Sequence, residues 1–188
     1  EWDGDPLRCP LFMPDMVNGV HCVCVGDWMD QDLDGLIEHY RQDLRYATQM
    51  QAEYVVFHAT QVCNMEGDTH KHVHTDEEVI DFLCDFVNRL LDGQNYSFYF
   101  LLENLWWSGL TFLRPEISRR LLDGIHYPKK GFMLDTGHFL HTNHDLTSQA
   151  EAVAYLHRML DAQEEMIPYI HGIHLQQSLT GEDAKKWL

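Results

Sequence analysis

The chain has 188 residues, of which 45% are hydrophobic, so it is long enough for one globular domain with a sizeable core. It carries 30 acidic and 13 basic side chains, and the resulting formal charge of −17 disfavours nucleic acid or an anionic membrane surface as a partner. A local cationic spot that holds one phosphate is still compatible with this charge.

The first third of the chain predicts two strands and one helix. Residues 1–19 hold three prolines and are expected to form an irregular lead-in. Residues 20–25 are rich in β-branched side chains and predict a strand. Apolar residues then recur at helical spacing over 32–51, and a second strand is predicted at 54–58. A polar loop is expected over 60–74.

The middle of the chain repeats the pattern of helix and strand. Thr75 and Glu78 have the spacing of a capping box, which predicts a helix that begins there and stops near Gly93. A third strand is predicted over 97–102. Pro115 stands where the first turn of the following helix would tolerate it.

The stretch 131–138, Gly-Phe-Met-Leu-Asp-Thr-Gly-His, predicts a buried fourth strand that ends in an acid. A histidine follows three positions later, in a turn that Gly137 can bend. A helix is then predicted from about 148 to 165 and a fifth strand over 169–175. Strands alternate with helices throughout, which predicts an α/β protein with a parallel sheet and right-handed crossovers.

A side chain able to bind a metal stands at or near the carboxyl end of each predicted strand. In a parallel sheet or barrel these ends lie on one face, where active sites are built. Histidine and carboxylate ligands suit Mn²⁺, Mg²⁺, Co²⁺ or Zn²⁺, and the scarcity of thiolates argues against a structural zinc cage. The residues are His21, His58, Glu103, Asp135 with His138, and His174.

The case for a site role differs among these residues. Glu103 follows a largely apolar strand, and burial of an unpartnered acid there would be costly, so a site role is favoured. His21 is better explained as a residue that only lines a pocket, and for His58 both interpretations stay open. His171 is predicted to share the face of His174 one layer down, as a structural histidine.

Asn104, next to Glu103 at the end of the third strand, is a further candidate ligand or pocket residue, and Trp106 and Trp107 follow after Leu105. The two tryptophans either form a pocket wall that stacks on a sugar ring or pack under a long loop. Asp27-Trp28, after the first strand, has the same two interpretations.

Two further polar motifs are expected to be surface features. The histidines in His70-Lys71-His72-Val73-His74 lie in the polar loop, where an exposed loop is favoured over a lid on the site. Lys129-Lys130 precedes the fourth strand and is expected to form a solvated turn on the face away from the site.

The cysteines indicate a reducing compartment. Their number, five, is odd, and the Cys22-x-Cys24 spacing is too short for a redox or zinc motif. The first residues do not resemble a secretory signal peptide, and no apolar run approaches the length of a membrane span. We therefore expect reduced thiols and a cytoplasmic protein. The cysteines are Cys9, Cys22, Cys24, Cys63 and Cys84.

Several of these motifs together resemble the xylose-isomerase-like TIM barrel superfamily, which includes sugar-phosphate isomerases, epimerases and apurinic-site endonucleases. The resemblance covers about residues 17–180 and implies a parallel (β/α) barrel of the TIM type. The matching stretches are Gly19-Val20-His21, Val55-Val56-Phe57-His58, Leu101-Leu102-Glu103-Asn104, Met133-Leu134-Asp135-Thr136-Gly137-His138 and Gly172-Ile173-His174-Leu175.

The resemblance also implies roles for individual residues. Glu103, Asp135 and His174 would ligate the metal. His138 would contact substrate in an epimerase, or a further metal in an endonuclease. His21 and His58 match ligand positions of the endonuclease type.

The chain departs from the family in its length. A full barrel has eight strands and about 250 residues, whereas the five strands predicted here match the second to the sixth. We therefore expect residues 1–188 to form one incomplete barrel domain of about five to six βα units, lacking the first and last strands. The glutamate that the eighth strand supplies in the family, as ligand and second acid/base, has no counterpart. Open sheet edges would favour a homo-oligomer.

The sequence thus leads to a hypothesis of a divalent-metal-dependent isomerase or epimerase acting on a ketose sugar or sugar phosphate through an enediolate. Glu103 would ligate the ion and transfer the proton, and His138 would orient a substrate oxygen. A metal-dependent phosphodiesterase acting on abasic DNA is one alternative, although no nucleic acid or membrane partner is expected. A non-catalytic sugar-binding remnant of the barrel is another.

Overall fold

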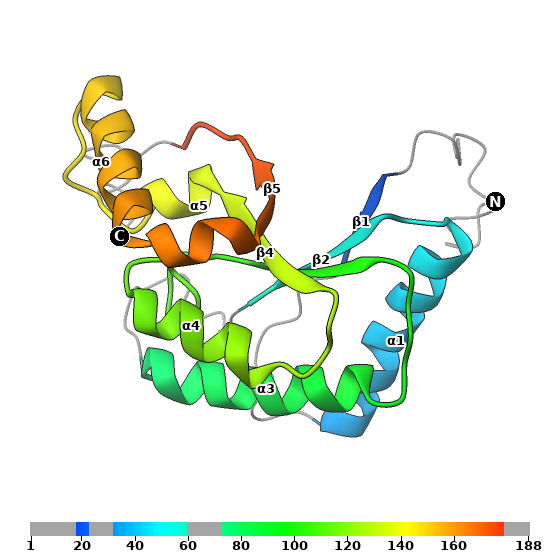
Figure 1. The fold of residues 1–188 in the computed structure, drawn as a ribbon. Coiled ribbons are helices and arrows are strands. Elements are labelled where there is room, and N and C mark those ends of the chain that lie inside the picture. The colour runs from blue at the N-terminus through cyan, green and yellow to red at the C-terminus, as the bar shows by residue number, and fades with distance from the viewer. Residues whose placement is uncertain (1–17, 23–31, 60–72, 179–188) are drawn as a thin grey trace, which may run out of the picture.

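The computed structural model describes residues 18–22, 32–59 and 73–178. Their five strands form a single sheet in which each strand lies next to its neighbour in sequence, and all four pairs are parallel. The sheet curls into half of a (β/α) barrel, which confirms the prediction of an incomplete parallel barrel (Figure 1). The strands are β1 (Gly19–His21), β2 (Tyr54–His58), β3 (Tyr99–Glu103), β4 (Lys130–Asp135) and β5 (Ile170–His174).

Three helices lie along one side of the curled sheet: α1 (Leu33–Gln49), α3 (Asp76–Leu91) and α4 (Pro115–Gly124) (Figure 1). The capping box of α3 is complete, because Thr75 Oγ1 accepts from Glu78 N at 3.2 Å and Glu78 Oε2 accepts from Thr75 N at 2.9 Å. Pro115 opens α4 as predicted.

Strands β2, β3 and β4 are buried on both faces over most of their length, as parallel strands usually are. On the face toward the helices, Phe57, Phe100 and Phe132 are fully buried in the main core. Successive side chains point to opposite faces of a strand, so the residues between them form a smaller cluster on the inner face. That inner cluster consists of Val56, Leu101 and Met133.

The chain after β4 does not form the simple turn that was expected around Gly137. It forms a short helix, α5 (Thr136–Leu140), for which Asp135 is the N-cap. The Oδ1 atom of Asp135 accepts a hydrogen bond of 2.8 Å from His138 N. The acid at the strand end therefore also starts the next helix.

The predicted helix over 148–165 is shorter in the structure. Helix α6 (Gln149–Ala162) is followed by a 3₁₀ helix, η4 (Glu164–Tyr169), that contains Pro168. Proline disfavours a continuing α-helix because it lacks an N–H and its ring clashes with the preceding turn. On helix α6 Tyr155 is buried and Val153 is 53% exposed, while four further apolar residues are half-buried against the core: Ala152, Leu156, Met159 and Leu160.

Cys22 is buried and Cys84 half-buried, and both are free thiols, as expected. The other three cysteines and the end of the first predicted strand, residues 23–25, lie outside the described residues. None of the helices within the described ranges is long and apolar enough to cross a bilayer.

Candidate functional site

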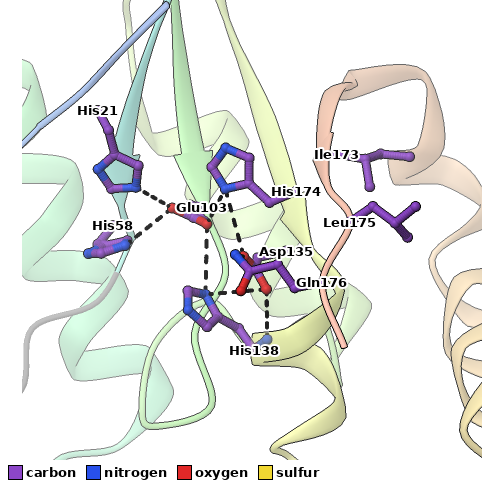
Figure 2. Close-up of a pocket in the computed structure, with 9 residues that line it drawn as sticks. All are labelled: His21, His58, Glu103, Asp135, His138, Ile173, His174, Leu175 and Gln176. Carbon is purple, nitrogen blue, oxygen red and sulfur yellow. Dashed lines mark hydrogen bonds and ion pairs between the residues drawn. The ribbon is translucent and has the colours of Figure 1, made fainter. Parts of the chain in front are cut away.

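The carboxyl ends of the strands surround one cavity of ≈ 560 Å³ (Figure 2). Every strand contributes one predicted residue, and α5 contributes another. The structure therefore brings together the whole set predicted from the strand ends. These lining residues are His21, His58, Glu103, Asp135, His138 and His174.

Glu103 lies at the centre of the cavity and is only 1% exposed. Its Oε2 atom is 2.9 Å from His21 Nε2 and 3.2 Å from His58 Nε2. Its Oε1 atom is 2.8 Å from His174 Nδ1. Three imidazoles from β1, β2 and β5 thus converge on one carboxylate of β3.

The environment keeps Glu103 ionised. Burial by itself raises the pKa of this carboxyl, but hydrogen bonds from His21, His58 and His174 outweigh burial and hold the pKa well below its usual range. Metal ligands must be deprotonated to bind an ion. Glu103 is therefore in the form that a metal site requires.

The ring of His21 lies between a backbone carbonyl and the Glu103 carboxylate. Its Nδ1 is 2.8 Å from the carbonyl oxygen of Cys22, which can only accept a hydrogen bond. With a proton on Nδ1, neutral His21 turns the lone pair of Nε2 toward Glu103 Oε2. Two acceptors cannot stand 2.9 Å apart unless a second ring proton or a metal ion lies between them. A ligating histidine typically donates its other nitrogen to such a carbonyl.

Asp135 is fully buried and has both carboxylate oxygens occupied. Oδ1 caps α5, and Oδ2 accepts a hydrogen bond of 2.7 Å from Gln176 Nε2. The Asn104 amide binds the Asp135 backbone, accepting from its N–H at 2.8 Å and donating to its carbonyl at 3.1 Å. Asn104, predicted as a pocket residue, therefore supports Asp135 and does not line the cavity.

His138 and His174 approach the two acids from opposite sides (Figure 2). Nδ1 of His138 is 3.0 Å from the Asn104 carbonyl and 3.7 Å from Glu103 Oε1. Nδ1 of His174 is 3.7 Å from Asp135 Oδ2. Since the Asn104 carbonyl can only accept a hydrogen bond from Nδ1 of His138, the Nε2 of the neutral ring is an acceptor.

Two overlapping groups of side chains could hold a metal ion. The first is the predicted triad Glu103, Asp135 and His174, and the second is His21, His58 and Glu103. Within each group the ligand atoms lie within 4.8 Å of one another. Glu103 belongs to both groups, with a different carboxylate oxygen nearest the histidines of each.

Strand β5 contains a bulge between its first and last residues. Phe132 pairs with Ile170, but Met133 pairs with Gly172, so β5 has one residue more than β4 over this distance. The extra residue, His171, lies against Tyr99 with ring centroids 4.9 Å apart. Simple alternation would place His171 and His174 on opposite faces, whereas the bulge puts His171 on the inner face, below His174, where it was predicted.

The two tryptophans lie beside the cavity and do not line it. Trp106 contacts His138 and His141, each with ring centroids 5.1 Å away. Trp107 contacts Trp106 with centroids 4.4 Å apart. Trp106 therefore packs against the ring of His138, and Trp107 packs against Trp106.

The remaining sequence motifs lie away from the cavity or outside the described residues. Asp27, Trp28, His70 and His72 belong to the latter group. Lys129 is exposed at the amino end of β4, as predicted, and Lys130 is half-buried there.

Neither Thr136 nor Gln176 was predicted to be a site residue. Gln176 lines the cavity together with Ile173 and Leu175. The signal that could have found Gln176 is its position two residues after His174, since residues two apart share a face of an extended chain. Nothing in the spacing indicated that Thr136 contacts it.

A family model described as xylose isomerase-like TIM barrel matches residues 17–187 of the chain. This range includes every strand and every residue of the cavity. The comparison of the sequence with curated proteins found no match.

Solved structures show the same fold at low sequence identity. A D-tagatose 3-epimerase-like protein is 18% identical, with a TM-score of 0.56, and the match covers 88% of this chain and 58% of that protein. Endonuclease IV from Thermus thermophilus is 20% identical, with a TM-score of 0.54, and the match covers 87% of this chain and 54% of the endonuclease. The chain thus spans little more than half the length of these neighbours.

Proposed function

The chain belongs to the xylose isomerase-like TIM barrel family, and on that premise we propose that it carries the metal- and substrate-binding part of a sugar isomerase or epimerase. The observation that supports this most directly is the ionised, buried carboxylate of Glu103 with imidazoles from three strands around it.

The donor set fits a divalent cation such as Mn²⁺, Mg²⁺, Co²⁺ or Zn²⁺. Glu103, Asp135 and His174 would hold it, because their ligand atoms share one small volume. A bound ion would supply Lewis-acid stabilisation of negative charge on a sugar carbonyl oxygen.

The remaining side chains would bind and orient the sugar. The Nε2 of His138, left as an acceptor by the Asn104 carbonyl, would accept a hydrogen bond from a sugar hydroxyl. Glu103 would take the proton from the carbon beside the carbonyl, giving an enediolate of the ketose or ketose phosphate. Its low pKa makes it a weak base, so we expect slow turnover by these 188 residues.

Two further expectations stay predictions. We expect association through the sheet edges, because within the described sheet β1 and β5 each pair with only one strand. A cytoplasmic location is expected from the free thiols of Cys22 and Cys84.

A metal-dependent phosphodiesterase acting on abasic DNA is the second candidate. The group of His21, His58 and Glu103 favours it, because it offers ligands for an ion additional to the one at Asp135 and His174. The formal charge of −17 counts against it, since DNA binding needs a basic surface.

Metal content and proton exchange test the proposal together. After loading with Co²⁺ and dialysis, elemental analysis is expected to find one ion per wild-type chain and none in Glu103→Gln. The exposed Glu53→Gln is the matched control and should keep the ion. In D₂O, NMR should detect slow deuterium uptake at the carbon beside the carbonyl of a ketohexose such as D-tagatose with wild type only.

The outcomes separate the candidates. Failure of wild type to bind an ion, or equal binding by Glu103→Gln, would contradict the metal site. Two or more ions per chain, with cleavage of an abasic-site oligonucleotide and no deuterium uptake, would favour the phosphodiesterase.

A further inference from the structure

The carboxyl end of β5 has little apolar packing to hold it. Ile173 is 60% exposed and Leu175 is 86% exposed. In the described sheet β5 has only one strand neighbour, β4, and their pairing ends at Asp135 and His174. Beyond this pair the backbone of β4 turns into α5 and offers no further ladder partner.

The hydroxyl of Thr136 takes the place of that missing partner. Its Oγ1 accepts a hydrogen bond from Gln176 N at 2.9 Å, and it is also 2.9 Å from the Gln176 carbonyl oxygen, to which it donates. The His174 carbonyl is a second acceptor at 3.3 Å. Thr136 is only 7% exposed, so water competes little for these bonds. The Thr136 hydroxyl thus holds the backbone of the strand end both as an acceptor, from the Gln176 N–H, and as a donor, to the backbone carbonyls.

The side chain of Gln176 carries this restraint into the site. With its backbone fixed by Thr136, its amide donates to Asp135 Oδ2 at 2.7 Å (Figure 2). Of the two Asp135 carboxylate oxygens, this Oδ2 is the one that faces His174, at 3.7 Å from its Nδ1. The space for this contact depends on Gly137, because a Cβ there would stand 3.1 Å from the Cβ of Gln176.

We propose that Thr136 and Gln176 are positioning residues that hold His174 and the Asp135 carboxylate in ligand geometry at the open end of the half-barrel. Thr136 fixes the strand end, and Gln176 fixes the rotation of the carboxylate. This inference rests on the proposed metal site. Partners that orient a ligand in this way typically change metal affinity by about 10- to 100-fold when they are removed.

The test is titration of the full chain with Co²⁺, followed by visible absorption and calorimetry. Thr136→Val keeps the shape but removes the hydroxyl, and Gln176→Ala removes the amide. Both are expected to weaken Co²⁺ binding by about 10-fold or more and to alter the absorption spectrum. Thr136→Ser, which keeps the hydroxyl, should restore affinity and spectrum, and the neighbouring Gln177→Ala should leave both unchanged.

Hydrogen exchange gives a readout that does not involve metal. Without metal, Thr136→Val should speed exchange of the Gln176 amide, which donates to Thr136, whereas Thr136→Ser should not. Wild-type affinity and spectrum in Thr136→Val would overturn this inference and leave the proposed site intact. Absence of Co²⁺ binding by wild type would overturn the proposed site and the inference that rests on it.

Discussion

Strands β2–β4 and strand β5 belong to one sheet but are packed very differently. On the helix-facing side of β2–β4, Phe57, Phe100 and Phe132 have no exposed surface. On β5, by contrast, Ile173 is 60% exposed. The candidate ligands come from both regions, Glu103 from the packed one and His174 from the open one. Packing therefore fixes one part of the site, and polar contacts must fix the other.

The largest expected effect comes from comparing two alanine substitutions, one in each region. Phe57→Ala removes a ring that contacts Tyr40, Phe86 and Phe100 at centroid distances of 5.0, 6.2 and 5.3 Å. It should lower the free energy of unfolding by about 3–5 kcal/mol. Ile173→Ala should change it by no more than about 0.5 kcal/mol. Urea denaturation measures both, and similar losses for the two would remove the contrast.

Metal binding should reduce the difference in local stability between strands β2–β4 and strand β5. An ion at about 100 times its Kd stabilises the folded state by about 2.7 kcal/mol. Because His174 would become tied to the ion, hydrogen exchange should slow more over 170–176 than over 99–103, which is already buried. Chelation should reverse the effect. Equal slowing in both segments would indicate that the ion binds elsewhere or stabilises the whole domain evenly.

Two helix caps provide a smaller comparison. Thr75 caps α3 in the packed region and Ser148 caps α6 at the open end. Thr75→Ala should cost about 1 kcal/mol in global unfolding. Ser148→Ala should cost less globally, because Tyr155 is the only buried residue among those of α6, but should speed local exchange in that helix. A larger global loss for Ser148→Ala would show that α6 is part of the main cooperative unit.

The smallest expected effect concerns Cys84 on α3. Burial is the main reason why the pKa of this thiol is raised to about 11, and the nearby carboxylate of Asp81 adds to the rise. The unfolded thiol loses its proton from about pH 8.5, whereas the folded one keeps it until about pH 11. Stability should therefore fall as pH rises between these values, with only a small fall below about pH 8.5, and less so in Cys84→Ala. Mass spectrometry should also find slow alkylation of Cys84 at about pH 8; fast alkylation would contradict its burial.

The alternation of strands and helices and the residue type at each strand end follow from the sequence alone. Glu103, Asp135 and His174 could be predicted because parallel strands end on one face, whatever the exact curvature. The Thr75 cap and the Pro115 helix start were equally local, since each depends on contacts within one turn. The charge of −17 needs no structure at all.

The distances between these residues, in contrast, depend on how the whole sheet folds. In a flat sheet, four strand spacings would separate β1 from β5 by about 19 Å, yet the rings of His21 and His174 have centroids 6.0 Å apart. The curl of the sheet, the bulge at His171 and the contact of Thr136 with Gln176 join residues far apart in sequence. Such contacts depend on the packing of the whole sheet, and the spacing of residues along one strand does not encode them.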